Sequence, residues 1–280
     1  MLENELKLFD AMQLFVNKNI GKQTVLISYA TNIGNVRPKN EDNLFIDGLG
    51  TRAKENMSGN RLLNHSERYT FAVCDGMGGE QFGDEASAIA SLAIAQYATQ
   101  LNRVKPEVLP DTVNKLVSEA NNRISRMVYS KHANLSGSTL VLTCLRKNKA
   151  YIFNLGDSRA YFFKDGELRQ ITEDHTVAKR KEKTQPLSDD DRKKLSDTHR
   201  LTTFLGVDSR WIGLKAQAYE PLNIRKGILL LCSDGLTDMC SKSEISEILS
   251  GEFKNCADRL VKRALKNGGT DNITCLAIKI

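Results

Sequence analysis

The chain has 280 residues, a length that allows one large domain or two ordinary ones. Hydrophobic residues make up 40% and charged residues 26%, a globular composition that excludes wholesale disorder. The 40 Lys and Arg exceed the 34 Asp and Glu by only six, and aromatic residues make up 6%. Because no basic stripe interleaved with aromatics appears, we expect no nucleic-acid partner.

The apolar runs are too short for a membrane span. The longest strictly aliphatic stretch is Ile228 to Leu231, whereas a spanning helix needs ~20 apolar residues. Glu3 and Glu5 stand where a secretory signal would carry cations. We therefore expect a cytoplasmic protein with no membrane partner. The six cysteines form no C-x-x-C pair and at least four lie in apolar runs, so we expect reduced structural thiols.

The first predicted element is an amphipathic helix, in which helical spacing relates Leu2, Leu6, Phe9, Met12 and Phe15. We expect residues 1–22 to be an N-terminal extension and residues 23–280 to form a single domain. Strand-like runs follow at Thr24 to Ala30, Asn43 to Asp47 and Tyr69 to Cys74. The polar stretch Gly48 to Arg68 is predicted to be an exposed loop.

The middle of the chain predicts a helix pair and then a meander of strands. The helices are Gly83 to Leu101 and Asp111 to His132. The strands are Ser138 to Arg146, Lys149 to Asn154 and Ala160 to Phe163, the last followed by a hairpin turn at Lys164-Asp165-Gly166.

A polar, charge-dense stretch from Thr176 to Arg200 is predicted to be a surface flap, with a short helix capped at Ser188. The remaining elements are strands at Leu214 to Tyr219 and Gly227 to Cys232, helices near Ser243 to Leu249 and Asn255 to Lys266, and a final strand at Asn272 to Ile280.

The order of these elements indicates the fold class. Strands come in clusters and helices in pairs, which favours an α+β fold over alternating β-α-β units. No repeat and no Pro/Gly/Ser-rich linker divides the chain. We therefore expect one domain in which two sheets pack together with helices outside.

Acidic residues stand at the ends of the predicted strands: Glu41, Asp42, Asp75, Asp157, Asp234 and Asp271. Carboxylates that converge on one rim repel one another, and a divalent cation is the usual remedy. Because the candidate ligands are oxygen donors without clustered His or Cys, Mg²⁺ or Mn²⁺ is favoured over zinc. Water between two such ions becomes a strong nucleophile and the ions neutralise a phosphoryl group, so the pattern predicts hydrolysis of a phosphate ester.

Arg37 is the candidate phosphate-binding residue. It lies four residues before Glu41, and its guanidinium fork matches two phosphate oxygens. Taken singly, Arg37 would be a surface charge and each Asp-Gly pair a turn. The combination of all these features on one chain is what favours a site.

Seven motifs follow one another in a recognisable order: Gly34-Asn35-Val36-Arg37-Pro38-Lys39-Asn40-Glu41-Asp42, Asp75-Gly76-Met77-Gly78-Gly79, Gly137-Ser138-Thr139, Gly156-Asp157-Ser158-Arg159, Asp174-His175, Ser233-Asp234-Gly235 and Gly268-Gly269-Thr270-Asp271-Asn272. The set resembles the metal-dependent protein serine/threonine phosphatases of the protein phosphatase 2C family, in a bacterial-type single-domain form. The motifs span most of the chain.

The resemblance implies a four-layer α-β-β-α sandwich, with two antiparallel sheets, antiparallel helix pairs outside them, and a metal centre between the sheets at one end. It implies two core Mg²⁺ or Mn²⁺ ions and a third, weaker one. Its catalytic residues would be Arg37, Asp75 and Asp234, with Arg37 binding the substrate phosphate. Its metal ligands would be Asp75 bridging both core ions, Asp234 and Asp271 on the first, Glu41 and the Gly76 carbonyl on the second, and Asp157 sharing the third with Asp234.

The implied activity is removal of phosphate from phosphoserine and phosphothreonine in proteins, by direct attack of a metal-bridged water or hydroxide. Phosphorylated proteins, the targets of a Ser/Thr kinase, would be the partners of a monomeric enzyme. The alternative is a catalytically silent phosphoprotein-binding scaffold of the same fold, which predicts a damaged set of metal ligands.

Four features depart from the pattern or stay open. Met77 stands where some relatives carry His and cannot donate a proton, so a metal-bound water is the provisional acid. The flap, at about residues 176–206, could steer acidic phosphopeptides with its Lys and Arg or simply be a solvated surface. The N-terminal helix and the 48–68 loop suggest no function.

Overall fold

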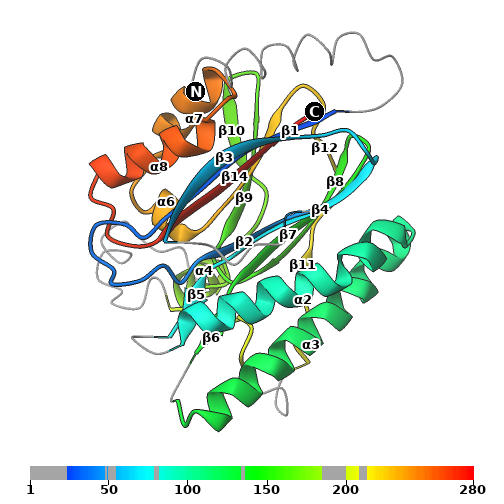
Figure 1. Ribbon diagram of the computed structural model, residues 1–280, viewed down its shortest axis with the longest axis vertical. Coiled ribbons are helices and arrows are strands. Elements are labelled where there is room, and N and C mark those ends of the chain that lie inside the picture. The colour runs from blue at the N-terminus through cyan, green and yellow to red at the C-terminus, as the bar shows by residue number, and fades with distance from the viewer. Residues whose placement is uncertain are drawn as a thin grey trace.

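A computed structural model describes residues 24–47, 49, 55–78, 82–133, 136–184, 200–207 and 213–280. Two antiparallel sheets pack face to face, and a pair of helices covers the outer face of each (Figure 1). The predicted α+β, four-layer sandwich is confirmed. The predicted helix within residues 1–22 and the helix capped at Ser188 lie outside the described residues.

The first sheet has the strand order β10-β9-β13-β14-β1-β3. Its strands are β10 (Glu167–Gln170), β9 (Arg159–Lys164), β13 (Ile228–Cys232), β14 (Ile273–Lys279), β1 (Val25–Asn32) and β3 (Asn56–Leu63). Every residue of β13 is buried, as its unbroken apolar sequence predicts for a central strand.

The second sheet has the order β11-β8-β7-β4-β2, and β12 also pairs with β8. Its strands are β11 (Gln217–Ala218), β8 (Lys149–Leu155), β7 (Leu140–Arg146), β4 (Arg68–Cys74), β2 (Asn43–Ile46) and β12 (Leu222–Asn223). A small separate sheet pairs β5 (Gly76–Met77) with β6 (Gly137–Ser138).

Helices α2 (Gly83–Arg103) and α3 (Leu109–Ser130), joined by a 3-10 turn at Pro106–Val108, cover the second sheet. Helices α7 (Lys242–Ser250) and α8 (Cys256–Lys266) cover the first. Two shorter helices, α4 (Val177–Thr184) and α6 (Asp234–Thr237), follow strands near one end of the sandwich. Helix α7 begins with a capping box, in which the Ser241 hydroxyl and the Glu244 carboxylate each accept from the other residue's backbone N–H. No described helix is long and apolar enough to cross a membrane.

Three apolar cores result: one between the sheets and one beneath each helix pair. All six cysteines are free and buried in these cores, which confirms the predicted structural thiols. Burial raises the pKa of the Cys144 and Cys232 thiols to about 12, so both stay protonated and unreactive at neutral pH.

The prediction of an exposed loop from Gly48 to Arg68 is wrong for its second half. Residues 56–63 form the edge strand β3, which pairs with β1 from Val25 opposite Leu63 to Asn32 opposite Asn56. Its polar, Gly-containing sequence has little strand propensity, so the pairing partner supplies the order that the local sequence does not predict. The strand predicted from Leu214 to Tyr219 is shorter in the structure, where only Gln217 and Ala218 pair with β8.

Candidate active site

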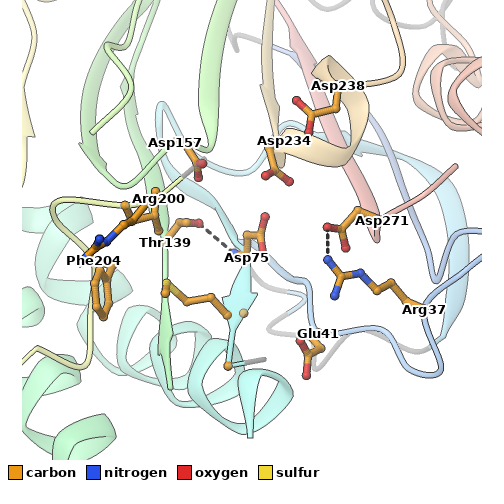
Figure 2. Close-up of a pocket in the computed structure, with 14 residues that line it drawn as sticks. Arg37, Glu41, Asp75, Thr139, Asp157, Arg200, Phe204, Asp234, Asp238 and Asp271 are labelled. Atoms are coloured by element: carbon orange, nitrogen blue, oxygen red, sulfur yellow. Dashed lines mark hydrogen bonds and ion pairs between the residues drawn. The ribbon is translucent and has the colours of Figure 1, made fainter. Parts of the chain in front are cut away.

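The acidic strand ends meet at one end of the sandwich, around a cavity of about 720 Å³ (Figure 2). Its lining consists of Arg37, Glu41, Asp75, Gly76, Met77, Gly78, Thr139, Asp157, Arg200, Leu201, Phe204, Asp234, Asp238 and Asp271. All seven residues that the sequence analysis assigned to the site are among them. Residues separated by more than 200 positions in the chain therefore share one cavity.

Strands from both sheets bring the carboxylates together. Asp75 follows β4 and Asp157 follows β8, two strands of the second sheet. Asp234 begins α6 directly after β13, and Asp271 stands two residues before β14, in the first sheet. Figure 2 shows these four carboxylates around a common space. The cavity thus lies where strands of the two sheets end, at one end of the sandwich.

Burial and mutual repulsion dominate the electrostatics of this cluster. Desolvation raises the pKa of Asp75 well above its ordinary value, and the charges of neighbouring carboxylates, Asp42 and Asp234 among them, raise it further. Burial and the charge of Asp234 also raise the pKa of Asp157. Such a cluster favours a bound cation, because positive charge removes the repulsion that holds these pKa values high.

Asp42 lies behind the cavity wall and is 1% exposed. Its Oδ2 accepts a hydrogen bond of 2.8 Å from the hydroxyl of Ser233, while its buried Oδ1 has no hydrogen-bond partner. Burial is the main cause that raises the pKa of Asp42 to about 7, with a further contribution from Asp234. Asp42 therefore joins the end of β13 to the start of β2. It is the third carboxyl group of the cluster, after Asp75 and Asp157, with a raised pKa.

Arg37 reaches the cavity from the loop between β1 and β2. Its Nη2 donates a hydrogen bond of 2.6 Å to Asp271 Oδ2, and this bond is the main cause of a raised pKa for Arg37. The Arg37 side chain is 48% exposed. The contact with Asp271 fixes the Arg37 side chain. Because a guanidinium carries five N–H donors, others remain for a ligand.

Glu41 is positioned by its backbone and lies beside the first turn of α2. Its N–H donates to Asn272 Oδ1 at 2.8 Å, and its carbonyl accepts from Gly76 N at 3.1 Å. Glu41 Oε1 forms an ion pair of 3.2 Å with Lys39 Nζ. The backbone of Glu41 is therefore tied to both the Asp75-Gly76 turn and the start of β14.

Thr139 is a site residue that the sequence analysis quoted within a motif but gave no role. Its hydroxyl accepts a hydrogen bond of 3.0 Å from the Asp75 N–H and shares one of 2.7 Å with the Ser158 hydroxyl. Thr139 N–H also donates to the Asp75 carbonyl at 2.8 Å. Thr139 therefore connects the turn that carries Asp75 to the turn that carries Asp157.

Asp238, Arg200 and Phe204 also line the cavity and were missed as site residues. Asp238 stands four residues after Asp234, next to α6, and this helical spacing could have indicated that both face the same side. Arg200 and Phe204 belong to the end of the predicted flap, where neither residue type nor spacing pointed to the cavity. Of the flap, residues 176–184 and 200–206 are described and residues 185–199 are not.

A largely buried ion pair fixes the start of the flap to the Asp157 turn. Arg159 donates three hydrogen bonds of 2.6 to 3.1 Å to the carboxylate of Asp174, and these side chains are only 25% and 16% exposed. The next residue, His175, accepts at Nδ1 from the Gly156 N–H and is bonded through Nε2 to Gln217.

Replacing Arg159 by Met is expected to lower the free energy of unfolding by about 3 kcal/mol, because it leaves the Asp174 carboxylate without its cation. Urea unfolding monitored by circular dichroism measures the change. The control is Lys262→Met, which removes an exposed pair with Asp258 and is expected to cost less than about 1 kcal/mol. Equal losses in the two variants would contradict a special role for the Arg159 pair.

The residues around the cavity fit a hard divalent cation. Within the described residues, no three His, Cys, Asp or Glu side chains are arranged so as to hold an ion as they stand. The donor chemistry nevertheless matches, because carboxylate oxygens from four strand ends surround the space and Glu41 also lines it. Within the described residues, neither the lining of this cavity nor any cluster elsewhere offers the His and Cys ligands that zinc prefers.

Comparison with known proteins identifies the family. Residues 35–185 match the model of the family described as protein phosphatase 2C. A serine/threonine phosphatase, stp, of Listeria welshimeri is 30% identical over 255 residues, which cover 90% of this chain and 94% of the relative.

Solved structures agree with this match over most of the chain. The serine/threonine phosphatase Stp1 from Staphylococcus aureus is 25% identical with a TM-score of 0.76, covering 91% of this chain and 94% of that one. The catalytic domain of the serine/threonine protein phosphatase PstP, solved in complex with two manganese ions, is 27% identical with a TM-score of 0.71, covering 91% and 98%. The chain therefore belongs to the protein phosphatase 2C family.

Proposed function

We propose that the protein is an active, metal-dependent phosphatase that removes phosphate from phosphoserine and phosphothreonine in other proteins. The observation that carries this proposal is the convergence of carboxylates from both sheets and one arginine on a single cavity. The two manganese ions in the related PstP structure support a two-ion centre of Mg²⁺ or Mn²⁺. The alternative, a silent scaffold, is disfavoured because each predicted ligand is present and lines the cavity.

The ligand assignment is carried over from the family resemblance, and the placement of the oxygen donors around the cavity supports it. Asp75, at the centre of the group, would contact both core ions; Asp234 and Asp271 would hold the first, and Glu41 with the Gly76 carbonyl the second. Asp157 would share a third, weaker ion with Asp234. When bound, the ions supply a water activated for direct attack on phosphorus and neutralise charge on the phosphoryl group.

The protein's own groups bind and orient the substrate. Arg37, held by Asp271, donates to the phosphate oxygens and fixes the phosphoryl group over the carboxylate cluster. Thr139 keeps the backbone of Asp75 in place through two hydrogen bonds. Met77 lines the cavity but has no transferable proton, so protonation of the leaving serine or threonine oxygen falls to a water of the site.

The substrates on this proposal are phosphoproteins made by a Ser/Thr kinase. A cytoplasmic location, a monomeric state and the absence of nucleic-acid or membrane partners stay predictions from the sequence.

The test is hydrolysis of a phosphothreonine peptide by the purified protein with Mn²⁺, with Mg²⁺, and with EDTA. We expect metal-dependent phosphate release that is lost with EDTA and in Asp234→Asn, and kept in Asp165→Asn, which alters an exposed hairpin turn away from the cavity. Folded protein that binds the phosphopeptide but releases no phosphate with either metal would establish the scaffold instead.

Gly83→Ala is expected to weaken Mn²⁺ binding about tenfold, because a Cβ at Gly83 would stand 2.8 Å from the carboxyl carbon of Glu41 and displace that side chain. The fold should tolerate the change, since the shift is confined to a flexible side chain and Ala favours the helix. Isothermal titration with Mn²⁺ measures the affinity. Gly251→Ala is the control, because its nearest contact would be an ordinary 3.5 Å to the Ile248 carbonyl. Unchanged Mn²⁺ affinity in Gly83→Ala would remove Glu41 from the metal centre.

A further inference from the structure

The cavity has an apolar side as well as a charged one. Three of the residues that line it carry large apolar side chains: Met77, Leu201 and Phe204. Figure 2 shows Phe204 on the opposite side of the cavity from Arg37, with Asp75 between them. In the proposed function the carboxylates bind the metal ions and Arg37 binds the phosphate. The apolar side has no role in that function.

The Phe204 side chain is held firmly against the small sheet of β5 and β6. A Cβ at Gly137 would stand 2.6 Å from Phe204 Cδ2, so the ring lies directly on the backbone of β6. The next residue, Leu205, is fully buried and exchanges two backbone hydrogen bonds, of 2.8 and 2.9 Å, with Ser138. Phe204 is only 9% exposed, so the part of its ring that reaches the cavity is fixed in one position.

Met77 and Leu201 are also carried by paired backbone. Met77 of β5 pairs with Gly137 of β6, so Met77 lies across the strand pair from the residue that the Phe204 ring contacts. Leu201 forms a β-bridge with Thr176 at the start of the flap. Met77, Leu201 and Phe204 therefore form a preformed apolar wall inside the cavity.

The size of the cavity leaves room for more than a phosphate. Its volume of about 720 Å³ falls in the range of about 300 to 1,000 Å³ that is usual for sites enclosing a whole small ligand. Met77 is two residues after Asp75, a span of about 7 Å in extended chain. The residue next to a phosphorylated one is only one Cα–Cα step of about 3.8 Å further along the substrate. A phosphate bound over Asp75 therefore places a flanking side chain within reach of the apolar wall.

We propose that the apolar wall is a specificity subsite for an apolar side chain next to the phosphoserine or phosphothreonine of the substrate protein. This inference rests on the proposed function, because it takes Arg37 and the carboxylate cluster as the place where the phosphate binds. An apolar side chain gains affinity by leaving water, and the cost of ordering is low because the backbone of the wall is already paired.

An acidic flanking residue is the competing occupant of this subsite. Arg200 also lines the cavity, and Figure 2 shows it on the same side as Phe204. Three apolar side chains against one cation favour the apolar occupant. The experiment includes both.

The experiment compares three phosphothreonine peptides that differ only in the two residues flanking the phosphothreonine, which are Leu, Ser or Asp. For the wild-type protein with Mn²⁺ we expect kcat/KM to be about tenfold higher for the Leu-flanked peptide than for the Ser-flanked one, mainly through KM. The Asp-flanked peptide should not exceed the Ser-flanked one. Because all three peptides carry the same phosphothreonine, the comparison isolates the flanking side chains.

The variants test the apolar wall itself. In Phe204→Ala and in Leu201→Ser the ratio of the Leu-flanked to the Ser-flanked peptide should fall to about two, whereas Phe204→Leu should keep the preference. Truncation of the buried Phe204 also lowers stability, so the partly buried Leu201 carries the test where Phe204→Ala does not fold. Circular dichroism and Mn²⁺ titration establish that each variant is folded and binds metal. Tyr129→Ala, which removes an aromatic ring that is 84% exposed on α3, should keep both the ratio and the activity.

Three results would overturn the proposal: equal kcat/KM for the Leu-flanked and Ser-flanked peptides, a preference for the Asp-flanked peptide, or folded wall variants that keep the tenfold ratio. Failure of the proposed function looks different, because the wild-type protein would then hydrolyse neither these peptides nor para-nitrophenyl phosphate. In that case the affinities of the same peptides, measured by fluorescence anisotropy, decide the matter. A Leu preference that is lost in the wall variants supports the subsite, and equal affinities or a preference for Asp overturn it.

Discussion

Asp75→Asn is expected to abolish phosphatase activity and, in EDTA, to make the protein more stable than the wild type. Activity should fall at least about 1,000-fold, since the loss of several kcal/mol of metal-derived stabilisation corresponds to a factor of that size. Stability should rise because burial and the neighbouring carboxylates disfavour the charge of Asp75 in the folded protein. Asn has the same shape, and the backbone hydrogen bonds between this position and Thr139 do not depend on the carboxylate.

The measurements are peptide hydrolysis with Mn²⁺ and the Tm in EDTA and in Mn²⁺. We expect Mn²⁺ to raise the Tm of the wild type much more than that of Asp75→Asn. Asp165→Asn, a change in an exposed turn, should leave activity and both Tm values unchanged. A Tm in EDTA below the wild-type value would mean that Asp75 serves folding, and activity above about a tenth of the wild-type level would remove it from the metal centre.

The opposed signs expected for activity and stability reflect how the site is built. Asp75, Asp157 and Asp234 sit at the ends of strands from different sheets, so the fold imposes their proximity. The sandwich is held by the apolar cores between and outside the sheets. The carboxylate cluster therefore lowers the stability of the metal-free fold, and the rest of the fold offsets this loss.

Much of this arrangement could be predicted from sequence because its signals are local. Strands β13 and β14 are unbroken apolar runs, and helices α2 and α3 show their periodicity over many turns. Asp234 and Asp271 were found because each adjoins such a strand. Their order in the chain then matched a family pattern, which local periodicity could not have provided.

The missed features depend on contacts between distant residues. Strand β3 forms because β1 offers it a backbone partner, and its own sequence carries no such signal. Arg200 reaches the cavity because the end of the flap pairs with its start: Thr176 forms a β-bridge with Leu201, and Val177 N–H donates to the Arg200 carbonyl. The role of Thr139 depends on the contacts of its hydroxyl with Asp75 and Ser158. These three residues lie in segments that follow β6, β4 and β8, and no spacing in the sequence reveals that they meet.

The metal-free protein is expected to lose stability as the pH rises from about 4 to about 7. The pKa of Asp42 is 3.8 when unperturbed and about 7 in the fold, where burial and the charges of Asp234 and Asp271 raise it. The folded state thus holds this proton more tightly than the unfolded state, so the stabilisation is complete below pH 4 and is lost as the pH approaches 7. The difference between these values, at about 1.4 kcal/mol per pH unit, corresponds to about 4 kcal/mol.

Urea unfolding in EDTA at pH values from 4 to 8 measures this loss, and Asp42→Asn should flatten the curve. Stability that rises over this range, as for a carboxylate paired with a cation, would contradict the prediction. Saturating Mn²⁺ should stabilise the wild type most at the high end of the range, because ionised carboxylates are both the ligands and the source of the repulsion. The same charge cluster would then account for the metal requirement of the enzyme and for the pH dependence of its fold.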